Sequence, residues 1–380
     1  MPNPLHFEEL NTALNTALNA ALEDVCRAGV PGLFAEVRAD GRVWRGAAGV
    51  ADLDTGEPVT VDMRHRVGSV TKTFTAVAVL QQVESGLIDL DAPIGGYLPD
   101  LVPGERGARI TVRMLLNHTS GLAEYLPYAY PSLRALPNIA ETSPQSLDDH
   151  RLTRFEATEL IGLGVDAPAA GAPGGTPGLY SNTNYLLLGA LIEHVTGITV
   201  DKYLTEHVIE RAGLRSTGLP TRPEIAGPHA KGYEAWFGMI DPPRDYSVFD
   251  MSWVGPTAAL VSTVSDLNRF YRLLLTGELI GPASLAQMQR TVPVVSQEGK
   301  VIDYGLGLYP TRAVEQPTFW GHGGTVWGSG TLAMTRADGR RQLAIAVNLQ
   351  RWNALDSAGQ PQPHPIDEAL AALYRVAMYG

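Results

Sequence analysis

Two residues near the start of the chain, Ser69 and Lys72, have the spacing of a nucleophile and its base. In "HRVGSVTKTFTAVAVLQQV" they precede an apolar run that predicts a buried helix. Three positions apart, their side chains lie on one helix face about one turn from each other. A serine hydroxyl needs a nearby base, and burial can lower a lysine pKa enough to supply one. Taken alone, this short pattern favours a helix-capping serine and a lysine that reaches solvent.

A tyrosine and an asparagine two positions apart form a second candidate group. The stretch "LYSNTNYLLLG" contains Tyr180, Ser181 and Asn182 between a Gly/Pro loop and an apolar helix. On a loop, alternate residues can point into the same cleft. A phenol can transfer a proton, and an amide can bind a lysine or a substrate carbonyl. Taken alone, the motif favours a helix entry with a packed tyrosine.

A histidine beside two glycines forms the third group. In "WGHGGTVWGSGTLAM", His322 is followed by Gly323 and Gly324 on a predicted strand. Glycines there allow a substrate to approach the backbone, and Thr325 could offer its N–H to an oxyanion. Taken alone, this pattern favours a glycine-rich strand edge with a structural histidine. The three groups together supply what acyl transfer through a covalent intermediate requires.

Other signatures and the composition exclude several classes of protein. The sequence has no GxSxG motif, which argues against an ordinary α/β-hydrolase. It has no HExxH or CxxC motif to indicate a zinc site, and "GAPGGTPG" lacks the GK[ST] of a phosphate loop. We expect no cofactor and no metal. The formal net charge is −11, with no basic block to bind nucleic acid. We expect the single cysteine, Cys26, to be a buried apolar residue.

No apolar run is long enough to span a membrane. The start of the chain carries no signal-peptide pattern, so we expect a cytoplasmic protein, or a secreted one if a leader was removed.

The order of the predicted elements indicates an α+β protein. An N-terminal amphipathic helix precedes a hairpin at "ADGR", and a second hairpin at "RADGRR" precedes a C-terminal helix. Helical patterns and Gly/Pro loops fill the middle. We therefore expect one antiparallel sheet built from both termini (1–75 and 230–380) and flanked by helices, with a mostly helical insertion (76–229) and the active site in the cleft between them.

The order SxxK, YxN, HxG resembles the serine β-lactamase and DD-peptidase superfamily. The branch that contains class C β-lactamases, D-aminopeptidases, Streptomyces-type soluble D-alanyl-D-alanine carboxypeptidases and family VIII esterases is the most similar. Further segments carry the resemblance over about 30–350, among them "GLIDLDAPIGGYLPD", "ITVRMLLNHTSGL", "MSWVGPTAALVSTVSDL" and "DYGLGL". The resemblance implies a β-lactamase/transpeptidase-like fold and a cofactor-free serine hydrolase with a covalent acyl-enzyme.

The resemblance also implies roles for individual residues. Ser69 would be the acylated nucleophile and Lys72 its base. Tyr180 would protonate the leaving group and help activate the water or amine that attacks the acyl-enzyme. Asn182 would orient Lys72 and the substrate amide. His322, in the place of the KTG lysine, would tune the proton on Tyr180.

Backbone N–H groups of Ser69 and Thr325 would form the oxyanion hole, with Gly323 and Gly324 in the substrate-binding strand. Trp253 of "MSWVG" would line the cleft. His118 of "NHTSGL" would be structural.

Two departures bear on the substrate. Soluble DD-carboxypeptidases of this branch have an HTG triad and an arginine after "GLGL", and both bind a terminal carboxylate. Here the triad is HGG and the next residue is Tyr309, with Arg312 three positions further on. Without the hydroxyl and the guanidinium, carboxylate recognition weakens, unless Arg312 compensates. We expect both Tyr309 and Arg312 to bind the substrate.

We therefore expect hydrolysis of an amide or ester in a small, D-amino-acid-containing substrate, by a DD-carboxypeptidase-like or D-peptidase-like enzyme. The alternatives are a family VIII-type carboxylesterase and a peptide-cyclising thioesterase that takes its acyl group from a carrier protein. A β-lactamase is less favoured. A catalytically silent penicillin-binding protein would need none of these side chains.

Overall fold

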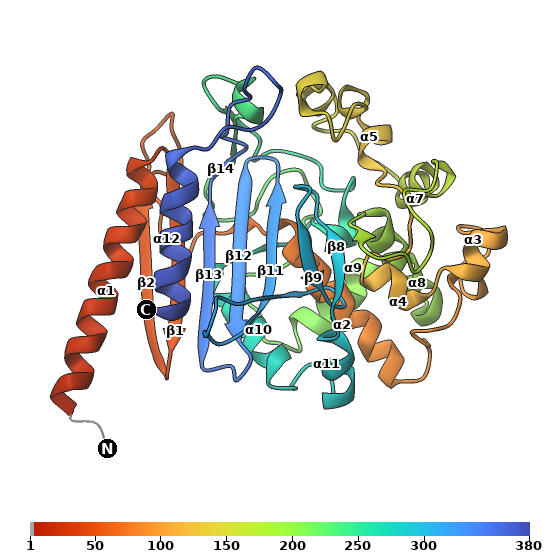
Figure 1. Ribbon diagram of the computed structural model, residues 1–380, viewed down its shortest axis with the longest axis horizontal. Coiled ribbons are helices and arrows are strands. Elements are labelled where there is room, and N and C mark those ends of the chain that lie inside the picture. The colour runs from red at the N-terminus through yellow and green to blue at the C-terminus, as the bar shows by residue number, and fades with distance from the viewer. Residues whose placement is uncertain (1–3) are drawn as a thin grey trace.

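The computed structural model describes residues 4–380, with side chains from residue 12 onwards. Its centre is a six-stranded antiparallel sheet in the order β10-β11-β12-β13-β1-β2 (Figure 1). Both termini contribute to it, as predicted, because β1 pairs with β13. The predicted hairpins join β1 to β2 and β12 to β13. The strands are β1 (Gly32–Ala39), β2 (Arg42–Gly49), β10 (Tyr309–Thr311), β11 (Phe319–Val326), β12 (Ser329–Arg336) and β13 (Arg341–Val347).

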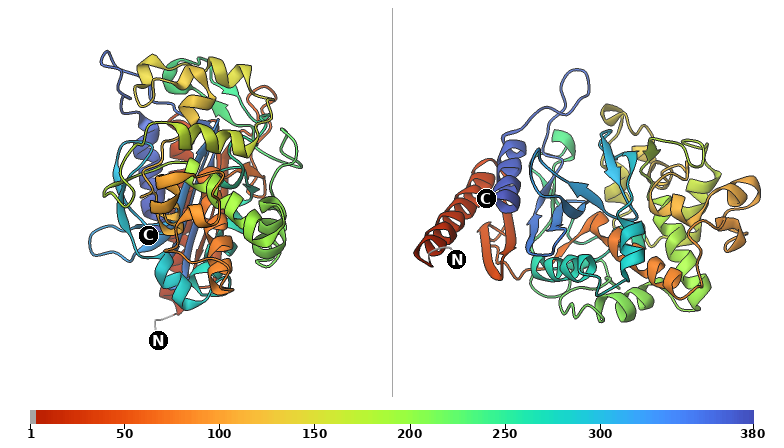
Figure 2. Two further views of the ribbon diagram at one scale, coloured as in Figure 1. Left: turned by 90° about the vertical axis from the view of Figure 1, so that its right-hand side faces the viewer. Right: turned by 60° about the horizontal axis from the view of Figure 1, so that its bottom comes forward.

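Helices cover the two faces of this sheet. On one face, α1 (Pro4–Arg27) and α12 (Pro365–Tyr379) lie side by side (Figures 1 and 2). On the other, α10 (Val264–Leu275) packs on β12, β13 and β1. The predicted terminal helices and the α+β class are confirmed.

A mostly helical region extends from the β11 side of the sheet, away from α1 (Figures 1 and 2). Its centre is formed by α2 (Thr71–Glu84) and α8 (Thr183–Thr196), which pack against each other. Around them lie α3 (Gly104–Arg109), α4 (Val112–Leu116), α5 (Leu126–Ala129), α6 (Gln145–Asp149), α7 (Ala157–Asp166) and α9 (Val200–Tyr203). The predicted boundary at 75/76 falls inside α2, and the division into two domains stays a prediction.

Small sheets and one further helix complete the fold. The small sheet that matters most for the site joins β4 (Gly178–Leu179) to the hairpin of β8 (Val292–Val295) and β9 (Val301–Tyr304). The stretch "PASLAQMQRTV" predicts a helix over 282–292, but α11 (Pro282–Met288) ends four residues before β8 begins at Val292. The remaining strands are β3 (His65–Arg66), β5 (Tyr233–Glu234), β6 (Arg244–Asp245), β7 (Val261–Ser262) and β14 (Leu349–Gln350).

The core holds α2 in place. Phe74 of α2 is fully buried and stacks on Phe270 of α10, with ring centroids 3.7 Å apart. Since α2 also carries Lys72, this contact connects the hydrophobic core directly to the predicted site.

We expect Phe74→Ala to reduce the free energy of unfolding by about 3–5 kcal/mol, because it removes a fully buried ring and leaves a cavity. Denaturant unfolding measures the change. Leu152→Ala is the control, since Leu152 is 66% exposed. A loss no larger than that of the control would contradict the assignment of Phe74 to the core.

Candidate active site

Ser69 and Lys72 lie together at the start of α2. Ser69 is in the 3-10 turn Gly68–Val70, and neither it nor another side chain caps α2. Lys72 Nζ lies 3.2 Å from Ser69 Oγ, and Lys72 has no exposed surface. The alternative of a capping serine with a solvent-reaching lysine is therefore wrong.

Lys72 is held in a buried polar niche. Its Nζ donates to Asn182 Oδ1 at 2.7 Å and to the Thr257 carbonyl at 3.2 Å. It also lies 4.9 Å from the centroid of the Tyr180 ring. Burial lowers the pKa of Lys72 to about 7, and the charge of Glu124 acts in the opposite direction. A substantial fraction of the amine is therefore neutral at pH 7 and able to take a proton from Ser69.

Asn182 connects Lys72 to Glu124, a residue that the sequence analysis missed. Asn182 Nδ2 and its backbone N–H both donate to Glu124 Oε2, at 3.0 and 2.8 Å. Burial raises the pKa of Glu124, while the N–H donors and Lys72 lower it. The only sequence signal for this residue is its place two positions after "NHTSGL". The chain Ser69–Lys72–Asn182–Glu124 can orient the amine and tune its pKa.

Tyr180 follows β4 and is tied to the β8–β9 hairpin, because its N–H donates to the Val295 carbonyl at 3.0 Å. Its hydroxyl is buried, with no close hydrogen-bond partner among the described residues. Burial raises the pKa of Tyr180 well above its usual value, and the neighbouring Ser69 side chain acts in the opposite direction. A protonated phenol next to Ser69 can donate to a leaving group.

His118 lies beneath Tyr180 and fits the structural role predicted for it. The two rings are tilted, with centroids 4.1 Å apart. His118 Nδ1 accepts from the Ser181 N–H at 3.3 Å and lies 3.1 Å from Asn184 Nδ2. This ring contact helps to hold the Tyr180 ring in place.

His322 lies on β11 and does not contact Tyr180, so the predicted tuning of the Tyr180 proton would have to pass through another residue. Its Nε2 lies 2.9 Å from the hydroxyl of Tyr304, and its Nδ1 contacts the Gly323 carbonyl. Tyr304 neighbours both residues, because its hydroxyl contacts His322 and its ring centroid lies 6.0 Å from that of Tyr180. Burial lowers the pKa of His322 to about 3, so the ring is neutral at pH 7. It cannot supply the positive charge of a KTG lysine.

The two predicted oxyanion donors lie close together. A Cβ at Gly324 would stand 2.9 Å from Ser69 N, and one at Gly68 would stand 2.5 Å from Thr325 N. Gly68 also has a φ of +56°, which favours glycine. These glycines allow the turn that carries Ser69 to approach β11, and Ser69 and Thr325 line the same cavity.

One cavity of about 370 Å³ brings most of the predicted site together. Ser69, Tyr180, His322, Gly323, Gly324, Thr325 and Tyr309 all line it. The Tyr309 hydroxyl accepts from the Gly323 N–H at 2.9 Å.

Two predicted binding residues lie elsewhere. Trp253 is buried and stacks on Trp327 with centroids 4.9 Å apart, and it does not line the cavity that contains Ser69. Arg312 is exposed just after β10 and does not line it either. The expectation that Trp253 lines the cleft is wrong for this cavity.

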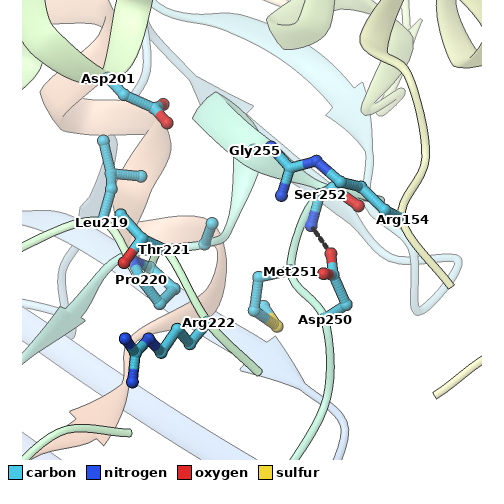
Figure 3. A pocket seen from close by; sticks show the side chains of 11 residues that line it. Arg154, Asp201, Leu219, Pro220, Thr221, Arg222, Asp250, Met251, Ser252 and Gly255 are labelled. Carbon is cyan, nitrogen blue, oxygen red and sulfur yellow. Dashed lines mark hydrogen bonds between the residues drawn. The ribbon is translucent and has the colours of Figure 1, made fainter. Parts of the chain in front are cut away.

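A second, smaller pocket of about 60 Å³ lies apart from these residues (Figure 3). It is lined by Arg154, Asp201 and Asp250, among others, and Asp250 Oδ1 accepts from the Ser252 N–H at 2.8 Å. None of the predicted catalytic residues reaches it. Within the described part of the chain, no three His, Cys, Asp or Glu side chains are grouped to hold a metal ion.

Comparisons with known proteins agree with this geometry. The Beta-lactamase family pattern matches residues 14–362. A D-stereospecific amidohydrolase from Streptomyces sp. is 35% identical, with a TM-score of 0.77 over 94% of this chain and 97% of that one. The D-amino acid amidase from Ochrobactrum anthropi SV3 is 25% identical, with a TM-score of 0.78 over 96% and 98%.

Penicillin-binding protein 4* of Bacillus subtilis (strain 168) is 24% identical over 82% of this chain, and the match spans 66% of that protein's length. Among the described residues, no helix is long and apolar enough to cross a membrane.

The rate of acylation should rise with pH through a midpoint near 7. Below that pH Lys72 is protonated and cannot accept the Ser69 proton, and above it the amine is neutral. Stopped-flow acylation by a D-amino acid ester between pH 5 and 9 measures the profile. A flat profile over that range would contradict the role of Lys72 as the base.

Glu124→Gln should move this midpoint to lower pH. The carboxylate raises the pKa of Lys72, so its removal leaves the amine neutral at lower pH, while the amide can still accept from Asn182. Glu105→Gln is the control, since the Glu105 side chain is 82% exposed. An unchanged midpoint in Glu124→Gln would show that Glu124 does not set the Lys72 pKa.

Proposed function

We propose, on the premise that this chain belongs to the Beta-lactamase family, that it is a serine hydrolase that cleaves amides or esters of D-amino acids through an acyl-enzyme. The observation that carries this proposal is the buried Lys72 amine, 3.2 Å from Ser69 Oγ and with a pKa of about 7. A capping or structural serine would have no need of such a base.

The arrangement of side chains supports two half-reactions. In the first, Ser69 Oγ attacks the carbonyl as Lys72 takes its proton, and the N–H groups of Ser69 and Thr325 bind the oxyanion. The bond to the leaving group breaks as Tyr180 donates a proton to it, and Lys72 restores the proton of Tyr180. In the second, Lys72 takes a proton from water as the water attacks the ester, and that proton passes to Ser69 Oγ as the bond to the acyl group breaks, which releases the acid and restores the Ser69 hydroxyl.

The similar proteins and the cavity together indicate the substrate class. The two solved relatives reported above are named as D-stereospecific and D-amino acid amide hydrolases. No arginine or lysine lines the cavity among the described residues, and the Tyr309 hydroxyl is already bound to Gly323. A substrate amide or ester without a free carboxylate therefore fits better than a peptide that ends in D-alanine.

A carboxylesterase is the second candidate, because the same uncharged lining suits an ester. An amine could also attack the acyl-enzyme in place of water, as in a peptide-cyclising thioesterase. That reaction would require a carrier protein as the acyl donor. Aminolysis products formed with added amines would identify it.

Ser69→Ala should abolish hydrolysis of D-phenylalanine amide, and Tyr180→Phe should slow it by about 10²–10⁴-fold, as for a lost general acid/base. Ammonia release measures both, with L-phenylalanine amide as the enantiomeric comparison. Tyr128→Phe is the control, because Tyr128 lies on α5 and packs against Arg134. Wild-type rates in Tyr180→Phe would remove its proton-transfer role.

A further inference from the structure

The cavity that contains Ser69 continues over the sheet face covered by α12. Strand register places Gly323, Leu332 and Ile345 in a row on that face, because each is the direct partner of the next. A Cβ on Gly323 would meet only the Tyr309 hydroxyl within 3.5 Å, with Leu332 Cδ1 3.8 Å away. The Tyr309 hydroxyl therefore occupies the space that a side chain at Gly323 would need, and the cavity that Ser69 lines extends to Leu332 and Ile345 on this face.

The far end of the cavity is formed by Trp352 and by Leu370 and Tyr374 of α12. All three pack with Leu332 and Tyr309 in the same hydrophobic cluster. Trp352 is fixed in place, since its Nε1 donates to Asp367 Oδ1 at 2.9 Å at the start of α12. Figure 1 shows α12 running lengthwise beside β13, the strand that carries Ile345. We name this region, lined by Tyr309, Leu332, Ile345, Trp352, Leu370 and Tyr374, the α12 compartment.

The compartment and the proposed proton donor belong to one cavity. Tyr180, the proposed proton donor to the leaving group, lines this cavity, as do Tyr304 and the hairpin tip at Ser296–Glu298. Trp253 and Trp327 belong to another hydrophobic cluster and do not line this cavity.

The charges of the lining restrict what can enter. Glu298 is the one acidic residue of the described lining, which holds no lysine or arginine, and burial lowers the pKa of His322 to about 3. A leaving group that carries a carboxylate would meet a negative side chain and no cation, whereas an aromatic or aliphatic group would meet apolar walls.

We propose that the α12 compartment binds the leaving group of the substrate, and that it selects a bulky apolar amine or alcohol without a carboxylate. This inference rests on the proposed function and names the second half of the substrate. The amine or alcohol leaves with the proton from Tyr180, while the acyl group stays on Ser69.

The test holds the acyl group constant as D-phenylalanine and varies the amine. Methylamine, butylamine and 2-phenylethylamine have similar basicities, so differences in kcat/KM report binding in the transition state and not leaving-group chemistry. We expect kcat/KM to rise from the methylamide to the 2-phenylethylamide, on the order of 10-fold or more. The dipeptide amide D-phenylalanyl-phenylalaninamide should also be cleaved faster than the dipeptide D-phenylalanyl-phenylalanine. The second compound differs only by its free C-terminal carboxylate.

Two variants locate the effect. Leu370→Trp fills the compartment and should lower the ratio of kcat/KM for the 2-phenylethylamide to that for the methylamide towards one. Tyr374→Ala removes volume, so it should move the preference towards larger amines, and it provides a readout if Leu370→Trp does not fold. Arg375→Ala, on the exposed side of α12, is the matched control and should keep the wild-type ratio.

The outcomes separate this inference from the proposed function. Turnover of all three amides with equal kcat/KM would overturn the leaving-group compartment and leave the serine hydrolase intact. A size preference that neither Leu370→Trp nor Tyr374→Ala changes would overturn its location beneath α12. No turnover of any amide, with no acylation of Ser69, would overturn the proposed function and this inference with it.

Discussion

The burial of Lys72 is the constraint on which the rest of the site depends. A buried ammonium is costly unless it is neutralised or paired, and none of the carboxylates in the described residues forms an ion pair with Lys72. Instead, Asn182 stands between Lys72 and Glu124, with one hydrogen bond to each. Direct contact with a carboxylate would hold the lysine protonated. An amide between them keeps the orientation that Glu124 provides and leaves the Lys72 pKa at about 7.

The sheet and the helical region each contribute what the other lacks. Strand β11 supplies backbone N–H groups and glycines that allow Ser69 to approach, and α8 begins directly after Asn182. Buried tyrosines occupy the space between them, and neutral His322 joins this cluster through Tyr304. The proposed electrostatic stabilisation therefore comes from oriented N–H groups and phenols, and no lysine or arginine of the described residues lines the cavity.

The three motifs contain most of the candidate catalytic residues, because each motif is short and contiguous in the sequence. Glu124 was missed because its contact with Asn182 joins segments 58 residues apart, and no spacing rule connects them. Tyr304 was missed because its partnership with His322 depends on how the β8–β9 hairpin folds back over β11. Trp253 was predicted to line the cleft, but its ring stacks on Trp327, a contact that the sequence does not indicate. Periodicity predicted both hairpins and the terminal helices, whereas the end of the helix before β8 depended on tertiary pairing with β4.

The most direct test of this account is the pKa of the Lys72 amine itself. Lys72, Lys202, Lys231 and Lys300 are the lysines of the chain, so ¹³Cε-labelled lysine gives a simple NMR spectrum, and Lys72→Ala assigns the signal. A base of this kind should give a Lys72 titration with a midpoint near pH 7. A midpoint near the ordinary lysine value of about 10.5 would contradict this role, because the amine would then be protonated at neutral pH and could not activate Ser69.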